Sequence, residues 1–285
     1  MSAPDRPFHD PVDLSVVVPA YNESARLQPT LVTVRDYLSH ADLSWELIVV
    51  DDGSTDDTPD IVKRAGDLSD RIRLLQLPQN RGKGCAVRSG VLDSQGRLVL
   101  LTDADLSTPI DELERLRAAL PGRVAAIGSR ALARSRIEVH QGHVREALGR
   151  LGNTFIRLLA VPHVVDTQCG FKLFDGARAR RLFSLAHVDG WAFDVEILHL
   201  CHRFGWPVVE VPVRWAHADG STIRPGAYAQ VLRDVLGIRW RYRGRNQRGA
   251  QKSIVDLRAR LSMQSAAQAR QSAWLDGSQV RRSAR

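Results

Sequence analysis

The stretch LVLLTDAD, residues Leu98–Asp105, decides the fold class of this chain. Its apolar half, Leu98–Leu101, has the length and composition of a buried strand in a parallel sheet. Asp103 and Asp105 follow where that strand should end, and residues two apart on an extended chain point to the same side. The two carboxylates are therefore predicted to face one hard cation or one diphosphate. On its own, Asp-x-Asp is also common in turns and at helix starts, so the flanking sequence has to decide.

Short apolar runs and amphipathic helical patterns alternate from Leu14 to about Val124. This alternation predicts an α/β fold, with a Rossmann-like parallel sheet and helices packed on it. The predicted strands are Leu14–Pro19, Glu46–Val50, Arg71–Leu77 and Leu98–Leu101. The predicted helices contain Leu27, Leu31, Val34 and Leu38; Ile61 and Val62; Lys83–Leu92; and Ile110, Leu113, Leu116 and Leu120. Thr58-Pro59 and Thr108-Pro109 are each predicted to be an N-cap followed by proline at the first helical position.

Polar residues follow three of the predicted strands: Pro19-Ala20-Tyr21-Asn22-Glu23, Asp51-Asp52-Gly53-Ser54 and Asp103-Ala104-Asp105. In open α/β sheets, ligands bind beyond the carboxyl ends of the strands. Turn chemistry explains any one of these clusters, but three in succession favour a ligand site.

Composition sets further bounds on the 285 residues, of which 44% are hydrophobic and 25% charged. The longest apolar runs fall well short of the roughly 18 to 20 residues that cross a bilayer, and the first residues lack a secretory pattern. We therefore expect a cytoplasmic protein. Cys85, Cys169 and Cys201 are odd in number and lack ligand-like spacing, which predicts reduced thiols rather than disulfides or a zinc site.

The net charge of +8 is concentrated in the last part of the chain. Residues 233–285 hold 13 Lys or Arg against 3 Asp or Glu, so residues 1–232 sum to about −2. Residues 228–242 are predicted to form an amphipathic helix with arginines and aromatic residues at its edges, which suits a membrane interface. The alternative is a helix packed on the body of the protein with a solvated arginine face. The tail itself is compatible with anionic lipid, nucleic acid or solvent.

Several segments together resemble the family 2 glycosyltransferases, which have the GT-A fold. They are VVVPAYNES (16–24), LIVVDDGSTDDT (47–58), NRGKGCAVRSG (80–90), TDADLSTP (102–109), GSR (128–130), DTQCGFKLF (166–174), GWAFDVEIL (190–198), EVPVRW (210–215) and GSTI (220–223). Within the family, they resemble the branch that transfers a sugar to dolichyl or another polyprenyl phosphate, above all the β-glucosyltransferases. The resemblance implies a catalytic domain over residues 14–224, preceded by an extension (1–13) and followed by a basic helix and tail (225–285).

The resemblance also implies roles for single residues on the donor side. Pro19, Ala20, Tyr21 and Asp52 would hold the nucleotide, with Asp52 accepting a hydrogen bond from uracil. Glu23 would fix the same loop or act as a helix-start carboxylate. Lys83 would face the diphosphate. Asp103, Ala104 and Asp105 would surround a Mg²⁺ or Mn²⁺ ion, with Asp103 and Asp105 as the metal-binding carboxylates.

On the acceptor side, Asp166 is the candidate catalytic base, or a residue that orients a phosphate acceptor that is already ionised. Arg130 and Lys172 are the cations suited to an acceptor phosphate or the donor diphosphate. The expected reaction is metal-dependent, inverting transfer of glucose from UDP-glucose to a polyprenyl phosphate, by an enzyme peripheral to the inner face of the membrane.

Other readings of the same sequence stay open at this point. The donor can be GDP-mannose, or the acceptor can be soluble, with the same fold. Two other classes are a nucleic-acid-binding α/β protein that uses the basic tail, and an inactive binding module that keeps the fold. The first leaves the strand-end carboxylates unexplained, because they would repel phosphates, so we expect no nucleic-acid partner. The oligomeric state is not indicated.

Overall fold

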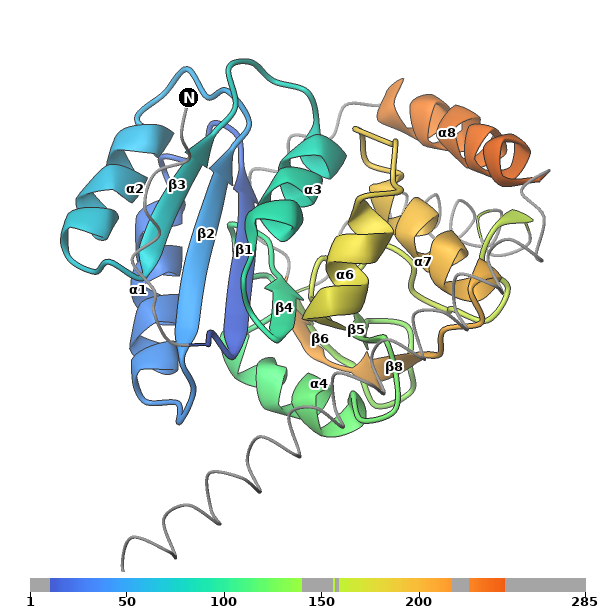
Figure 1. Cartoon of the computed structure of the whole chain (residues 1–285), viewed down its shortest axis with the longest axis horizontal. Helices are drawn as coiled ribbons and strands as arrows, with labels where there is room; N and C mark the ends of the chain where they lie inside the picture. Colours follow the sequence, from blue (N-terminus) through green and yellow to red (C-terminus); the bar gives the residue numbers. More distant parts are fainter. Residues whose placement is uncertain (1–10, 140–155, 157–158, 217–225, 244–285) are drawn as a thin grey trace, which may run out of the picture. The chain divides into compact units, whose positions relative to one another are not determined.

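The computed structural model describes residues 11–139, 156, 159–216 and 226–243 of the chain (Figure 1). The chain divides into two compact units, residues 1–241 and 242–285. Its elements, in chain order, are β1 (Leu14–Ala20), α1 (Leu27–Ser39), β2 (Trp45–Asp51), α2 (Thr58–Asp67), β3 (Ile72–Gln76), α3 (Lys83–Asp93), β4 (Leu98–Leu101), η1 (Ile110–Glu112), α4 (Leu113–Ala119), β5 (Ala125–Ser129), β6 (Arg136–Val139), β7 (Lys172–Asp175), α6 (Gly176–Phe183), α7 (Phe193–Arg203), β8 (Val208–Pro212), β9 (Arg214–Ala216) and α8 (Gly226–Tyr242).

The central sheet has seven strands in the order β3-β2-β1-β4-β7-β5-β8. Strands β1 to β4 pair in parallel, and β8 pairs in parallel with β5. Strand β7 lies between β4 and β5 and runs antiparallel to both. A separate two-stranded parallel sheet joins β6 to β9. The expected α/β fold is confirmed, with the difference that one strand of the sheet is reversed.

Both faces of the sheet are covered, which explains why its strands are apolar without alternation. On one face, Val16 and Val18 belong to the core that also holds the apolar residues of α1, α2 and α4. On the other face, α3 packs so closely that a Cβ on Gly90 would lie 2.5 Å from Val17 and 2.7 Å from Val50. Figure 1 shows α3 and α6 in front of the strands, with α1 beyond them. The sheet is therefore a rigid layer whose edges position the loops.

The predicted strands agree with the observed ones to within one residue at each end. Both N-cap predictions are wrong. Asp57 is the N-cap of α2, and the Thr58 hydroxyl accepts a hydrogen bond from the Glu23 N–H instead (2.8 Å). Pro109 precedes a 3₁₀ turn, η1, and the α-helical part begins only at Leu113. In the first case a tertiary hydrogen bond outcompetes the local cap.

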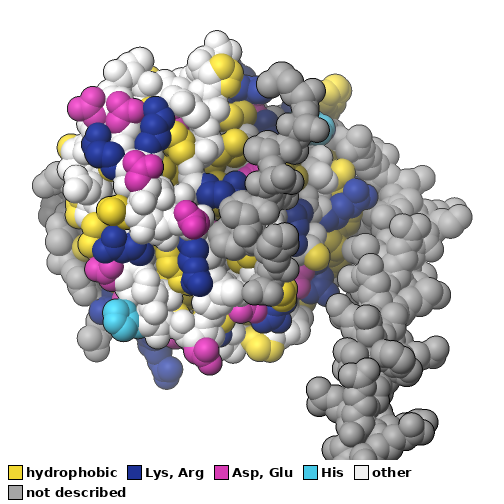
Figure 2. Space-filling model, turned by 60° about the vertical axis from the view of Figure 1, so that its left-hand side comes forward, with side chains coloured by type: hydrophobic (Ala, Val, Ile, Leu, Met, Phe, Trp, Pro, Cys, Tyr) yellow, Lys and Arg dark blue, Asp and Glu magenta, His cyan; other side chains and the backbone are white. Residues whose placement is uncertain are grey.

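The three cysteines are buried free thiols, as predicted. On the face of the molecule seen in Figure 2, acidic and basic side chains alternate, in keeping with the small net charge of residues 1–232. Within the part of the chain that the structure describes, no helix is both long and apolar enough to cross a membrane. The expected boundary between catalytic domain and tail at residues 224 and 225 stays a prediction.

Candidate active site

The carboxyl ends of β1 and β2 are joined to the start of α3 through Asp52. Its N–H donates to the Ala20 carbonyl (2.9 Å), and its carboxylate accepts from the backbone N–H groups of Arg81 (2.9 Å) and Gly82 (2.7 Å). Burial raises the pKa of Asp52, although the two N–H donors oppose the shift. Each carboxylate oxygen has a second acceptor site. Asp52 therefore holds the loop in place and retains acceptor capacity for a ligand.

The loop after β1 presents Tyr21 to solvent on a fixed backbone. Asn22 adopts a left-handed conformation (φ 53°), which asparagine tolerates better than most residues. Its N–H donates to the Ser54 hydroxyl (2.8 Å), and its side-chain oxygen accepts from the Thr55 N–H (2.9 Å). The Tyr21 ring stays 39% exposed beside Pro19 and Ala20. An exposed ring on a rigid loop is suited to stacking on a flat base.

Glu23 takes part in a chain of charges that leads to Asp105. Its carboxylate forms an ion pair with Arg26, and the Arg26 guanidinium lies 3.9 Å from Asp105. Asp105 also accepts from the Ser107 N–H (2.9 Å), while the Ala104 carbonyl accepts from the Thr30 hydroxyl (2.6 Å). These bonds fix the loop after β4. Arg26 thus links Glu23 to Asp105. The sequence analysis did not single out Arg26.

Asp103 and Lys83 form an ion pair between the loop after β4 and the first residue of α3 (2.6 Å). Burial raises the pKa of Asp103, but the Lys83 charge outweighs it and holds the carboxyl below its usual value. Conversely, Asp103 and Asp194 hold the Lys83 pKa above its usual value against burial. The Lys83 ammonium also lies 5.2 Å from the centre of the Trp191 ring. Both charges persist at neutral pH in a half-buried position.

Arg130 and Asp166 form a two-pronged ion pair after β5. Nε and Nη2 of Arg130 donate to the two Asp166 oxygens (2.7 and 2.8 Å), and the Arg130 N–H adds a third bond (2.9 Å). Burial raises the pKa of Asp166, but Arg130 more than offsets it and the net shift is downward. Glu210 accepts the N–H groups of Val165 and Asp166, which fixes the segment. A carboxylate held in this way is a weak base and a strong anchor for Arg130.

Lys172 lies deeper than expected. The side chain is buried, and its ammonium donates to Asp194 (2.6 Å) and to the Cys169 carbonyl. Burial raises the pKa of Asp194 despite the Lys172 charge beside it. This geometry favours a positioning role for Lys172 rather than direct contact with a phosphate. Asp194 lies in the GWAFDVEIL segment that the resemblance flagged, but sequence analysis gave it no role.

The three ion pairs share one neighbourhood. The charges of Lys172 and Arg130 both lower the pKa of Asp103. The segment after β4, the segment after β5 and the start of β7 therefore lie close together. A Cβ on Gly170 would lie only 2.0 Å from an Asp103 oxygen, which shows how closely these segments approach. The structure therefore brings Lys83, Asp103, Arg130 and Asp166 together. Among the described residues, no group of three or more His, Cys, Asp or Glu side chains is arranged so that it could hold a metal ion.

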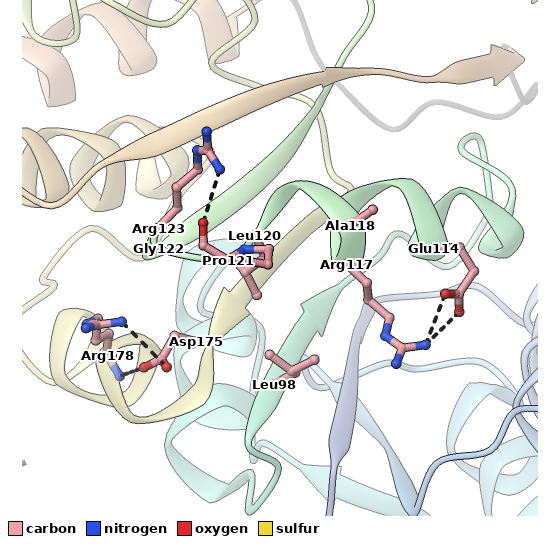
Figure 3. A pocket seen from close by; sticks show the side chains of 10 residues that line it. All are labelled: Leu98, Glu114, Arg117, Ala118, Leu120, Pro121, Gly122, Arg123, Asp175 and Arg178. Atoms are coloured by element: carbon pink, nitrogen blue, oxygen red, sulfur yellow. Dashed lines mark hydrogen bonds and ion pairs between the residues drawn. The ribbon is translucent and has the colours of Figure 1, made fainter. Parts of the chain in front are cut away.

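A separate pocket of about 560 Å³ lies elsewhere (Figure 3). It includes Leu98, the first residue of β4, and Asp175, the last residue of β7, whereas Asp103 follows the opposite end of β4. Four of its charged side chains pair with one another, Arg117 with Glu114 and Arg178 with Asp175, and the fifth, Arg123, donates to the carbonyls of Ala119 and Pro121. This pocket is therefore at the far end of the strands from the candidate site, and we assign it no function.

Solved structures with the same fold confirm the GT-A expectation. Glucosyl-3-phosphoglycerate synthase from Mycobacterium tuberculosis, in complex with Mn²⁺ and UDP-glucose, superimposes with a TM-score of 0.60 at 23% identity, covering 80% of this chain and 79% of that one. Mannosyl-3-phosphoglycerate synthase from Rubrobacter xylanophilus gives 0.59 at 18% identity, covering 83% and 76%. At such identities the likeness concerns the fold alone.

Relatives found by sequence share a higher identity with this chain than these structures do. A dolichyl-phosphate beta-glucosyltransferase from Dictyostelium discoideum is 41% identical over 249 residues, covering 82% of this chain and 76% of the relative. The human dolichyl-phosphate beta-glucosyltransferase is 38% identical over 246 residues, covering 80% and 75%. Residues 15–175 match the family described as glycosyl transferase family 2. The match includes β1 to β4 and the segments that hold Lys83, Asp103, Arg130 and Asp166, so this chain belongs to glycosyl transferase family 2.

Proposed function

We propose that this protein transfers glucose from UDP-glucose to a polyprenyl phosphate of the dolichyl type, with inversion at the anomeric carbon. The observation that carries the proposal is the convergence of Lys83–Asp103 and Arg130–Asp166 at one edge of the sheet. This pairing occurs in a chain 41% identical to a dolichyl-phosphate beta-glucosyltransferase over most of both lengths. Cations held by carboxylates beside an exposed aromatic suit a nucleotide diphosphate on one side and a phosphate acceptor on the other.

On the donor side, Tyr21 would stack on the base and Asp52 would accept the ring N–H. Lys83, at the first residue of α3, would attract the diphosphate by its charge. Pro19, Ala20 and Glu23 would shape the same loop. Together they hold the nucleotide while the bond to the sugar breaks.

The residues present fit a divalent cation. Asp103 and Asp105 offer hard oxygen ligands from one loop, and Asp103 is ionised because its pKa is held below its usual value. Such ions typically take one or two carboxylates and complete their shell with substrate phosphates and water, which agrees with a site of two protein ligands. A bound Mg²⁺ or Mn²⁺ would neutralise charge on the leaving diphosphate.

On the acceptor side, a phosphate monoester is already anionic at neutral pH and needs orientation more than deprotonation. Arg130 spends two of its five N–H groups on Asp166 and would direct others at the acceptor phosphate. An acceptor oxygen would then attack the anomeric carbon from the face opposite the diphosphate. Asp166 acts here by fixing Arg130, and Lys172 and Asp194 support the wall of the site.

The test is transfer of radiolabelled glucose from UDP-glucose into the organic-extractable fraction, with polyprenyl phosphate and Mn²⁺. We expect lipid-soluble label that Asp105→Ala abolishes and that Asp60→Ala, an exposed carboxylate on α2, leaves unchanged. GDP-mannose in place of UDP-glucose tests the alternative donor. Label that stays water-soluble in every reaction would refute the lipid acceptor, and full activity of Asp105→Ala would refute the metal assignment.

A further inference from the structure

Helix α8 carries an exposed apolar ridge on the side turned away from the rest of the protein. The structure describes eight large hydrophobic side chains that are exposed, and five of them are scattered over separate elements. The other three, Leu232 (38%), Leu236 (53%) and Trp240 (79%), are on α8. Positions four apart on an α-helix lie about 40° apart around its axis, so these three form one ridge.

The opposite side of α8 is held against the body of the protein. Val235 and Ile238 are fully buried. Arg241, on this side, lies 3.4 Å from Glu196 of α7, and Arg239, at the border of the exposed side, donates one N–H group to the Leu159 carbonyl (2.8 Å). One face of the helix therefore packs on the body of the protein, and this packing fixes the direction in which the exposed ridge points.

Arginines border the ridge on both sides. On a helix of 3.6 residues per turn, Arg239 lies about 20° before Leu232, and Arg233 about 20° beyond Trp240. A tryptophan and two leucines between arginines make the pattern that lies flat in a lipid headgroup region, where the apolar groups insert and the guanidinium groups meet anionic lipid. Residues 233–285 carry 13 Lys or Arg against 3 Asp or Glu, and this charge would itself attract anionic lipid.

We propose that the ridge Leu232–Leu236–Trp240, with Arg233 and Arg239, docks the protein on the surface of an anionic bilayer. Because arginines border the ridge, we expect it to bind anionic lipid in preference to neutral lipid. Docking goes beyond the transfer reaction, and its use in bringing the enzyme to a lipid-linked acceptor rests on the proposed function.

The experiment is cosedimentation of the full chain with vesicles of phosphatidylglycerol and phosphatidylcholine, without donor or acceptor. We expect binding that falls with added salt and is weak on phosphatidylcholine alone. The triple variant L232S/L236S/W240S should bind at least about tenfold more weakly, because inserted apolar side chains contribute most of the affinity beyond charge. A matched control, V32S/L68S/L92S, removes three exposed apolar side chains from other elements and should bind like the unmodified protein.

A spectroscopic readout separates insertion from mere attraction by the tail. Vesicles should shift tryptophan emission to the blue in the unmodified protein, and Trp240→Phe should lose most of that shift while still sedimenting. Undiminished binding by the triple variant would show that the basic tail suffices and would overturn the proposal. An unchanged emission shift in Trp240→Phe would also overturn it. The same holds if the unmodified protein is a dimer in solution and the triple variant is a monomer. Because no substrate is present, these outcomes are independent of the transfer assay.

Discussion

Gly170→Ala tests the geometry of the site with a single methyl group. A Cβ built on Gly170 would lie 2.0 Å from one Asp103 oxygen, 2.5 Å from its carboxyl carbon and 2.8 Å from the other oxygen. Contacts of this kind normally exceed about 3 Å, so the carboxylate has to move by about 1 Å. Gly170 does not adopt a left-handed backbone, so alanine brings no conformational strain of its own.

The displacement should separate the effects on activity and on stability. Asp103 is half-buried and can rotate away from the methyl group. We therefore expect the free energy of unfolding to change by no more than about 1 kcal/mol. Rotation breaks the 2.6 Å contact with Lys83 and shifts a proposed metal ligand. A misplacement of about 1 Å at a reacting centre costs about 100-fold, and we expect that loss in kcat/KM for UDP-glucose.

The assay is kcat/KM against Mn²⁺ concentration, beside thermal unfolding. Gly237→Ala is the control, because nothing lies within 4 Å of a Cβ added there. That variant should keep full activity. If Gly170→Ala is within about threefold of the unmodified protein at every Mn²⁺ concentration, Asp103 does not act where we place it.

Three further predictions follow from described contacts. Lys172→Met should cost about 3–5 kcal/mol in chemical denaturation because it leaves Asp194 buried without its cation, and K172M/D194L should recover much of that loss. Hydrogen bonds from Ser44 lower the pKa of Asp13 from 3.8 to about 2, so Asp13 adds stability at neutral pH that is lost as pH falls toward 2; in acid titrations Asp13→Asn should lack this dependence. Tyr21→Ala should weaken UDP binding in calorimetry by about tenfold or more, whereas Tyr21→Phe should not, because stacking needs only the ring.

The sequence predicted the parallel half of the fold well because that half is locally encoded. Strands β1, β2 and β4 are short, mainly apolar runs followed by turn residues, and the pattern alone located Leu98–Leu101. It also located the polar clusters at the strand ends, since these follow directly from the sheet topology.

What the sequence could not predict depends on contacts between distant residues. The segment Lys172–Asp175 has only two apolar residues, Leu173 and Phe174, between two charged ones, so neither the strand nor its reversed direction stands out in the sequence. The Thr58 hydroxyl bonds to a backbone group 35 positions away, so a local cap rule misplaced it. The pairing of Lys172 with Asp194 spans 22 positions, and nothing in either motif shows that the lysine points inward.

The reversed strand β7 also brings together the segments that hold the proposed donor-side and acceptor-side residues. It pairs directly with β4, with Lys172 opposite Leu101, so the residues just before β7 arrive beside those just after β4. Gly170 and Asp103 lie two residues outside β7 and β4, and the pairing of these two neighbouring strands brings the two residues together. We therefore expect a donor sugar of different size or linkage to be accommodated by residues outside these two paired strands.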